Sequence, residues 1–586
     1  MTITTNAGAT HATATQEKGL APARAAQLEA VIDQLAEGEA AWAAMSLPAR
    51  DALLGRVHDA VAENAAKWVD AAVVAKKLDP ASPLVGEEWQ SGPYALLTSL
   101  AVLRHSIRAL ADGRSPIAGR RLGRAPGNRV TVPVLPANSY ESLLFHGFHA
   151  DVWMMPGVSA QQARDDAGLG EKRPKDTDGV GLVLGAGNIT SIAPLDVLYE
   201  LIAHNRVVLL KLNPTLDALH EPLEAAFAPL IELGLLRIVT GGGDVGGYLA
   251  HNDRISHVHI TGSAATHDVV VWGPGPEGAR RKAAGTPLLK KPITSELGGV
   301  APVIVVPGTW SKADLAFQAE HVATMRLHNG GYNCIAGQLA IVSSDWPQKD
   351  EFLAALRKAF DEAPRRDPWY PGSDSRVDQA GTSYPAAEKL AGGSRLLIDL
   401  KPGDDASALE TTEYFSPVFG VIEVAGTGQA FLDAAVQTAN DDFVGTLGAN
   451  VIIDPATRRK LGAGFDEAIA RLHYGSIAIN AWTGVVFLAA GAPWGAFPGH
   501  TLENISSGMG VVHNAFLLAD TERAVLSGPF RPFPRSIAGG EFALFPKPPW
   551  FVSARSAKRT GELLSAFAAK PSWLRMPGVF ISAFRA

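Results

Sequence analysis

The sequence is almost without cysteine, which excludes several kinds of site. Cys334 is the only cysteine among 586 residues. A single cysteine permits no disulfide within the chain and no metal or iron–sulfur site built from several thiolates. The histidines show no zinc-type spacing either, and His146 and His149 have no acidic residue between them. We therefore predict that the protein holds no metal.

An excess of positive charge and a long apolar helix are also missing. Lys and Arg number 52 against 59 Asp and Glu, which argues against a nucleic-acid partner because phosphates require a basic surface. The longest uncharged run, residues 474–500, contains Asn480, two prolines and several glycines, so it favours a buried strand and loop over a membrane span. The first 16 residues lack the basic start and apolar block of a signal peptide. We expect a cytoplasmic protein with no integral membrane segment.

What the sequence does contain is typical of a globular protein with several domains. Hydrophobic residues make up 47% and charged residues 19%, a composition that supports a buried core. Residues 22–112 are rich in Ala and Leu at helical spacing and predict several amphipathic helices. Residues 129–134 and 150–154 predict strands, and the polar residues 159–178 predict an exposed loop.

Strands and helices then alternate, which indicates an α/β fold. Short apolar runs predict strands, and the segments between them predict helices over 194–205 and 216–233; the strand runs are 181–184, 207–211, 236–240 and 257–261. A second series begins at residues 301–306 and continues to about residue 500. Such alternation implies parallel sheets with helices on their faces.

Three short motifs near the ends of predicted strands could serve chemistry, although each alone is weak. Residues 242–247 are rich in glycine and open a helix, where a phosphate could approach the backbone, but a plain strand-to-helix turn explains them equally well. Thr261-Gly262-Ser263 and Glu296-Leu297-Gly298-Gly299 follow. A carboxylate between strand and glycines can act as a general base, but such a residue is more often a surface residue.

Cys334 could be a nucleophile. A lone cysteine is more often a small buried apolar residue. Its neighbours at 329–338 are nevertheless glycine-rich and polar, and such surroundings favour an accessible thiolate.

Taken together and in order, the motifs resemble the aldehyde dehydrogenase superfamily over about residues 25–515. The motifs are Gly187-Asn188, Lys211, Gly242 to Gly246, Thr261-Gly262-Ser263, Glu296 to Gly299, Cys334, Glu413 to Val418, Tyr474 to Asn480, and Pro493-Trp494-Gly495. The resemblance implies a Rossmann-type cofactor-binding domain, an α/β catalytic domain and a strand-type bridging or oligomerisation segment. The corresponding ranges are a disordered tail at 1–18, the NAD(P)-binding domain at 19–129 and 158–295, bridging strands at 130–157, the catalytic domain at 296–500, and a C-terminal extension at 501–586.

The resemblance also implies a role for each matching residue. Cys334 is expected to attack the aldehyde, Asn188 to hold the oxyanion together with the Cys334 N–H, and Glu296 to activate the water that hydrolyses the thioester. The expected NAD or NADP site consists of Lys211, Gly242, Gly246, Gly262, Ser263, Leu297, Glu413 and Phe415. The expected substrate pocket consists of Tyr332, Asn333, Trp482 and Phe487.

The sequence departs from the family pattern at several points. Pro214 stands where an acid normally binds the adenosine ribose and would repel a 2′-phosphate, so the choice between NAD and NADP stays open. Ser416 replaces a glycine after Phe415. An insertion near residues 273–291, rich in Gly, Arg and Lys, is expected to form a surface loop.

We therefore predict oxidation of an aldehyde to its carboxylic acid by an NAD(P)-dependent homodimer or homotetramer. The stretch 481–487 is apolar and aromatic and has no Lys or Arg, which favours a hydrophobic small-molecule aldehyde. A CoA-acylating reductase of the same fold is the first alternative, but such enzymes usually lack a glutamate at the position of Glu296. The second alternative is a structural protein without catalytic activity that kept the fold.

The last part of the chain differs from the rest in composition. Residues 521–586 carry ten Lys and Arg against three Asp and Glu, together with ten Phe and Trp. Because a free segment of this kind would expose a large apolar surface, we expect it to lie on the body of the protein or on a neighbouring subunit. An arm that binds a membrane surface or an anionic partner is the alternative.

Overall fold

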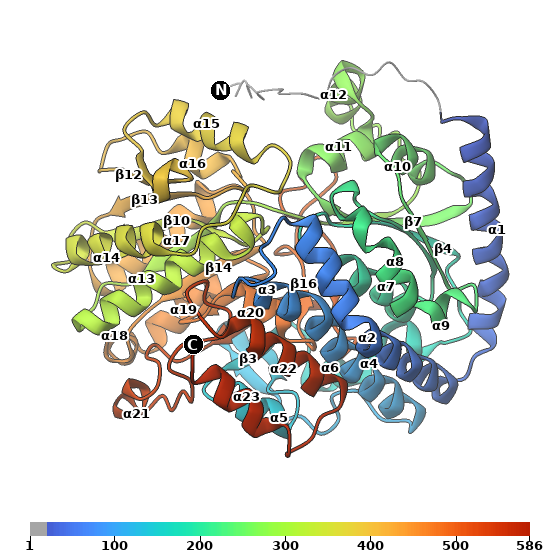
Figure 1. Cartoon of the computed structure of the whole chain (residues 1–586), viewed down its shortest axis with the longest axis horizontal. Helices are drawn as coiled ribbons and strands as arrows, with labels where there is room; N and C mark the ends of the chain where they lie inside the picture. The colour runs from blue at the N-terminus through green and yellow to red at the C-terminus, as the bar shows by residue number, and fades with distance from the viewer. Residues whose placement is uncertain (1–19) are drawn as a thin grey trace.

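The computed structural model describes residues 20–586, so the tail predicted at 1–18 lies outside the described residues. Two large sheets organise this part of the chain, one of six strands and one of eleven. Helices cover their faces, and the last helices, drawn in red, lie in front of strand β3 (Figure 1). Within this part of the chain, none of the helices combines the length and apolar character that crossing a membrane requires.

The N-terminal region consists of helices, as the sequence predicts. They are α1 (Pro22–Ala44), α2 (Leu47–Ala75), α3 (Val85–Trp89) and α4 (Ala95–Ala111), with a π-helical turn at Gln90–Tyr94 before α4. Helix α2 buries Leu54, Val61 and Trp68 at helical spacing. This apolar side of α2 attaches the helices to the body of the protein.

The six-stranded sheet has the predicted Rossmann-type arrangement. Its order is β17-β8-β7-β4-β5-β6, for strands β17 (Gly508–Met509), β8 (Ile293–Leu297), β7 (Ile255–Gly262), β4 (Val180–Leu184), β5 (Val207–Lys211) and β6 (Leu236–Val239). All neighbours are parallel except β17, which runs antiparallel to β8. The strand order reverses between β4 and β7, and a crevice opens beside the carboxyl ends of strands at such a point.

Three helices follow these strands closely. Helix α7 (Ile192–Ala203) comes after β4, and every one of its residues is buried. Helix α10 (Gly243–Ala250) follows β6, and α11 (Ala264–Trp272) follows β7. The Ser263 hydroxyl caps α11 by accepting a hydrogen bond from the Thr266 N–H at 3.2 Å. The N-termini of α10 and α11 therefore both begin at the crevice.

Two segments that the sequence predicts as continuous helix or loop are built differently. The segment 216–233 is divided into a 3₁₀ turn at Pro214–Leu219 and helices α8 (His220–Ala226) and α9 (Ala228–Ile231). The division falls just before Pro229, which cannot donate a helical hydrogen bond. The insertion at 273–291 is not a loop throughout, because it contains α12 (Gly275–Ala283), in which Glu277 pairs with Arg280 and Arg281.

The polar segment at 159–178 is only partly the predicted exposed loop. It contains α6 (Ala160–Asp165) and a 3₁₀ turn at Leu169–Lys172. Within that turn, Glu171 is buried and pairs with the buried Arg50 at 2.6 Å. This ion pair joins the segment to helix α2.

The eleven-stranded sheet carries the second half of the chain. Its order is β1 (Gly123–Ala125), β2 (Arg129–Leu135), β3 (His149–Met154), β19 (Thr521–Ser527), β15 (Ser476–Ile479), β14 (Gly448–Ile452), β9 (Ala301–Val305), β10 (Gly337–Ser343), β13 (Val418–Val424), β12 (Arg395–Asp399) and β11 (Glu388–Leu390). The strands from β19 to β12 are parallel, and the strands beyond them at both ends are antiparallel.

The segment 130–157, predicted to form bridging strands, joins the large sheet of its own chain. Strand β3 pairs with β19, and β19 pairs with β15. Strand β19 lies between β3 and β15 and so connects this segment to the rest of the sheet. The range 501–586 therefore includes an inner strand of the sheet as well as an extension.

Beyond β19 the chain lies on its own body. Helix α22 (Ala557–Ala569) packs against α3, and α23 (Met576–Ala583) packs against α22 (Figure 1). The approach is close, because a Cβ added at Gly561 would lie 2.8 Å from the Trp89 Cβ. Gln90 also donates a hydrogen bond to the Pro549 carbonyl at 3.3 Å. Residues 528–586 are called the C-terminal segment below.

Candidate active site

A groove lies at the carboxyl ends of β4 and β7, with a cavity volume of about 560 Å³. Of the eight residues predicted to bind a cofactor, all except Leu297 line it: Lys211, Gly242, Gly246, Gly262, Ser263, Glu413 and Phe415. Leu297 ends β8 with its side chain buried, and its N–H donates to the Ser507 carbonyl at 2.9 Å. The groove thus gathers residues that are far apart in the sequence.

The groove has the features of a dinucleotide site. The helix N-termini at Gly243 and Ser263 supply backbone N–H groups, and helix N-termini attract phosphates. Nothing lies within 4 Å of a Cβ added at Gly243 or Gly247, so bare backbone leaves room for a ligand there. On the other side, a Cβ at Gly298 would overlap the Glu413 carboxylate. Only glycine at this position allows Glu413 to enter the groove.

Asn188 and Cys334 lie where this groove meets a second, apolar pocket, because both residues line both cavities. Asn188 is buried and donates one amide N–H to the Tyr332 carbonyl at 3.0 Å. An amide has two N–H bonds, so the other remains available near Cys334. The geometry places a thiol and an amide donor at one junction.

The Cys334 thiol lies beside Glu296, and the surroundings raise the pKa of both groups. Burial raises the pKa of Glu296 to about 7, while the hydrogen bond from Cys334 acts in the opposite direction. Burial also raises the pKa of the Cys334 thiol well above its ordinary value, and the negative charge of Glu296 raises it further. Cys334 is only partly buried and lines both cavities, while its raised pKa favours the thiol over the thiolate.

Glu413 is a second buried carboxyl group in the groove. Burial raises its pKa to about 8, although Arg326 and Arg376 lower it. Arg326 donates to the carbonyl of Ser416, the residue that departs from the family pattern. Arg376 also lines the groove and lies 6.0 Å from the Phe415 ring centroid.

The apolar pocket contains three of the four predicted substrate residues. Asn333, Trp482 and Phe487 line it. Its further walls are Ile189, Ile192, Ile335, Val485, Leu488, Trp494 and Trp550. Tyr332 does not line this pocket, because its hydroxyl turns to Ser373 Oγ at 2.7 Å and its ring borders another cavity. The prediction is therefore wrong for the Tyr332 side chain. The Tyr332 backbone still serves the site, because its carbonyl accepts the hydrogen bond that orients Asn188.

A buried charge network below the Cys334 loop escaped the sequence analysis. Lys76 pairs with Glu88 at 2.8 Å and donates to Asn329 Oδ1 at 3.2 Å. Glu87 accepts from the Asn329 N–H at 3.0 Å and pairs with Arg366 at 2.5 Å. Asn329 adopts a positive φ of 55°, a strained conformation that surrounding bonds must maintain. The only sequence signal is the Glu87-Glu88 pair within an apolar helical stretch.

A second buried cluster lies beside Glu296. Thr261 donates to Asp196 at 3.0 Å, and His259 lies 3.5 Å from the same carboxylate. Burial lowers the pKa of His259, but Asp196 outweighs it, and the pKa lies above its ordinary value. Asp196 in turn raises the pKa of Glu296. Across residues 20–586, no group of three or more His, Cys, Asp or Glu side chains could hold a metal ion.

Comparison with known proteins agrees with this arrangement. The aldehyde dehydrogenase family model matches residues 190–376. A curated relative, the betaine aldehyde dehydrogenase of Cereibacter sphaeroides, is 29% identical over 280 residues, which cover 44% of this chain and 51% of the relative. The chain thus spans about half the length of the curated relatives it matches.

Solved structures with the same fold match over a longer range. The γ-glutamyl-γ-aminobutyraldehyde dehydrogenase of Burkholderia cenocepacia is 19% identical with a TM-score of 0.57, covering 86% of this chain and 88% of that one. Aldehyde dehydrogenase C of Pseudomonas syringae, solved with NAD⁺ and octanal, is 19% identical with a TM-score of 0.54, covering 87% and 90%. At this identity the likeness shows the fold.

Proposed function

We propose that the chain, which the aldehyde dehydrogenase family model matches over residues 190–376, is a member of that superfamily and oxidises an apolar aldehyde to the carboxylic acid with NAD or NADP. One observation carries the proposal. Cys334 lies at the junction of a groove with dinucleotide features and an apolar pocket. A nucleophile at such a junction can meet an aldehyde on one side and a hydride acceptor on the other.

The residues of the groove fit a nicotinamide dinucleotide. The N-termini of α10 and α11 would hold the pyrophosphate, and Lys211 and Glu413 would bind ribose hydroxyls. When bound, the nicotinamide accepts the hydride that leaves the substrate carbon. Every other step falls to residues of this chain.

In the first step the Cys334 sulfur bonds to the aldehyde carbon to form a thiohemiacetal. The thiol proton is released to solvent as the sulfur attacks, so the adduct carries an oxyanion on the former aldehyde oxygen. The Asn188 amide and the Cys334 backbone N–H would stabilise the oxyanion, an effect worth about 3 kcal/mol per donor in related sites. Loss of hydride then leaves a thioester on Cys334.

In the second step Glu296 removes a proton from the water that attacks the thioester. A base works best when its pKa is near the working pH, and burial raises the pKa of Glu296 to about 7. The products are the carboxylic acid and the free thiol. Glu296 thus acts after hydride transfer, as the base of the hydrolytic half of the reaction.

The apolar pocket supports a hydrophobic substrate. Its walls include Ile189, Val485 and Phe487, and no Lys or Arg lines it. Although Gln90, Ser91 and His328 also line it, the pocket has no Lys or Arg to pair with an anionic group, and it gains from burying hydrocarbon. The solved neighbour from Pseudomonas syringae contains octanal, an aldehyde of the class proposed here.

A CoA-acylating reductase of the same fold is the second candidate. Its thioester would pass to CoA instead of water, and a general base beside Cys334 favours water. Product analysis with and without CoA separates the two, because acyl-CoA would form only in the second case. A protein without catalytic activity would give neither product.

Two further properties, the oligomeric state and the location in the cell, are also proposed. A homodimer or homotetramer is proposed by resemblance, and the sheet offers the edge strands β1 and β11 for contacts between subunits. A cytoplasmic location is proposed because a single, functional thiol suits a reducing compartment.

The proposed function is tested by incubating the protein with a panel of aldehydes and either NAD or NADP. Formation of NADH or NADPH with aliphatic or aromatic aldehydes, lost in Cys334→Ala, is the expected result. Absence of reduction with every aldehyde, or full activity in Cys334→Ala, would overturn the proposal.

A further inference from the structure

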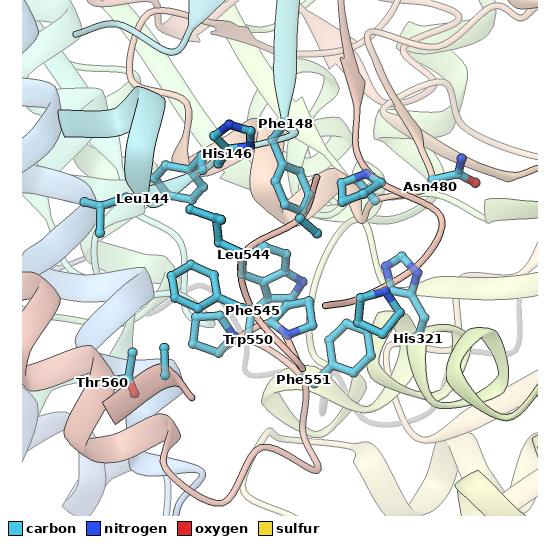
Figure 2. A pocket seen from close by; sticks show the side chains of 18 of the residues that line it. Leu144, His146, Phe148, His321, Asn480, Leu544, Phe545, Trp550, Phe551 and Thr560 are labelled. Carbon is cyan, nitrogen blue, oxygen red and sulfur yellow. The ribbon is translucent and has the colours of Figure 1, made fainter. Parts of the chain in front are cut away.

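A second apolar cavity lies beyond Trp550, and the C-terminal segment builds most of its wall. We call it the distal chamber, defined by Phe148, Leu544, Phe545, Trp550, Phe551 and Val579 among its lining residues. Figure 2 shows Phe148, Leu544, Phe545 and Trp550 gathered around one space, with Phe551 below them. Most of these side chains come from the C-terminal segment, which lies beyond residues 25–515, the range that resembles the family.

Three polar side chains of the distal chamber, those of Arg531, His321 and Asn480, are neutral or already paired. Arg531 forms two hydrogen bonds to Asp314, at 3.0 and 3.1 Å. Burial lowers the pKa of His321 to about 3, so this ring is neutral. Asn480 uses its side-chain oxygen to accept from the Ile453 N–H at 2.8 Å. None of these three side chains is left to receive a carboxylate or phosphate.

The distal chamber adjoins the apolar pocket of Cys334. Trp550 lines both cavities, and the adjacent residues Ala481 and Trp482 line one each. The Trp550 indole N–H has no hydrogen-bond partner among the described residues. Its ring is held by packing, for example against Phe148 at a centroid distance of 5.6 Å. Trp550 is therefore a shared wall without a polar anchor.

We propose that the distal chamber receives the far end of a long unbranched aliphatic aldehyde whose carbonyl carbon lies at Cys334, past Trp550. This inference rests on the proposed function and assigns its substrate class. The C-terminal segment would then select chain length without touching the reacting atoms. Each methylene buried in such a chamber increases affinity roughly fourfold, so kcat/KM should rise with chain length beyond the capacity of the first pocket.

The test narrows the chamber and compares short with long substrates. Val579 is buried and lines the chamber, whereas Ile581 on the same helix is 57% exposed. Val579→Phe should lower the kcat/KM ratio of dodecanal to butanal at least tenfold and leave butanal oxidation unchanged. The matched control Ile581→Phe should leave the ratio unchanged. An unchanged ratio in a folded Val579→Phe protein would overturn the inference.

A second variant and a binding measurement cover the other outcomes. Ala583→Leu, also in the chamber wall, gives the same comparison should Val579→Phe fail to fold. Calorimetric titration with dodecan-1-ol, which is not an aldehyde, tests the chamber without turnover. The inference is supported if the wild type binds dodecan-1-ol and either folded variant binds it at least tenfold more weakly. This holds even if no aldehyde is oxidised, because that result would overturn only the proposed function. No binding by the wild type, or equal binding by both variants, would overturn the inference.

Discussion

The Cys334 thiol lies beside the Glu296 carboxyl group, and Cys334 lines both the groove and the apolar pocket. Each group influences the protonation of the other. The charge of Glu296 raises the pKa of Cys334, and the hydrogen bond from Cys334 lowers the pKa of Glu296. Since the chain has a single cysteine, this coupling can be measured without interference from other thiols.

The first prediction concerns alkylation of Cys334. Because burial and Glu296 raise the thiol pKa, iodoacetamide should react slowly at pH 7 and faster as the pH rises. Glu296→Gln removes a negative charge and should shift the rate profile down by roughly one pH unit. Glu413→Gln is the matched control with a smaller shift, since Glu413 affects Cys334 less. A profile in Glu296→Gln that stays in place or moves to higher pH would contradict the coupling.

The second prediction concerns stability and pH. Burial raises the pKa of Glu413 to about 8, above the ordinary carboxyl value of about 4.3 in an unfolded chain. The folded state therefore binds more protons in this window, and its stability contribution falls as the pH rises from about 4.3 to 8. The glutamine side chain introduced by Glu413→Gln cannot lose a proton. The free energy of unfolding of this variant, relative to that of the wild type, should therefore rise by roughly 1–3 kcal/mol from pH 5 to pH 8. Urea unfolding at both pH values measures this, and an equal difference at both would refute it.

The third prediction is that the enzyme accepts NADP as well as NAD. Pro214 replaces the acid that would oppose a 2′-phosphate, and Asn213 and Thr215 present neutral side chains to the groove. Pro214→Glu should increase the preference for NAD at least tenfold, whereas the control Pro214→Ala should not. The measurement is kcat/KM for both cofactors. A wild-type preference for NAD above roughly a thousandfold, about 4 kcal/mol, would contradict the prediction.

The fourth prediction concerns the C-terminal segment. Removal of residues 529–586 should lower the melting temperature and the solubility, because it uncovers buried apolar side chains and leaves Asp314 without Arg531 and Arg535. The cut must follow β19, since a cut after residue 520 would remove an inner strand of the sheet. An unchanged melting temperature, oligomer size and activity would show a loose tail. Binding of anionic vesicles by the intact protein alone would favour the membrane-surface arm instead.

The strands around the cofactor groove were predictable because their signals are local. The apolar run at 207–211 matches β5 to the residue, since a strand buried on both faces needs continuous apolar side chains. The order of Asn188, Glu296 and Cys334 likewise identified the residues that meet at the site. The helix α12 was missed even though Glu277, Arg280 and Arg281 have the spacing of helical ion pairs.

Features that depend on distant contacts were not predictable. Lys76 reaches Asn329 across 253 positions, and no spacing rule connects them. The direction of the Tyr332 ring depends on a hydrogen bond to Ser373, which lies 41 positions further on at the start of helix α15 (Ser373–Ser383). Trp550 was visible only as one aromatic residue in a basic tail, and its position beside the Cys334 pocket follows from the docking of that tail on α3.

The most direct test of the central claim is a pre-steady-state burst experiment with Glu296→Gln and excess substrate. On mixing with octanal and NAD, the variant should release a burst of NADH equal to the enzyme concentration, while steady turnover falls roughly 10²–10⁴-fold, the range for a lost general base. Mass spectrometry of the stalled protein should find an octanoyl group on the peptide that contains Cys334. A stalled protein with a full burst but no acyl group on Cys334 would contradict a covalent route through this cysteine. Loss of the burst itself would assign Glu296 to the activation of Cys334 instead of to hydrolysis.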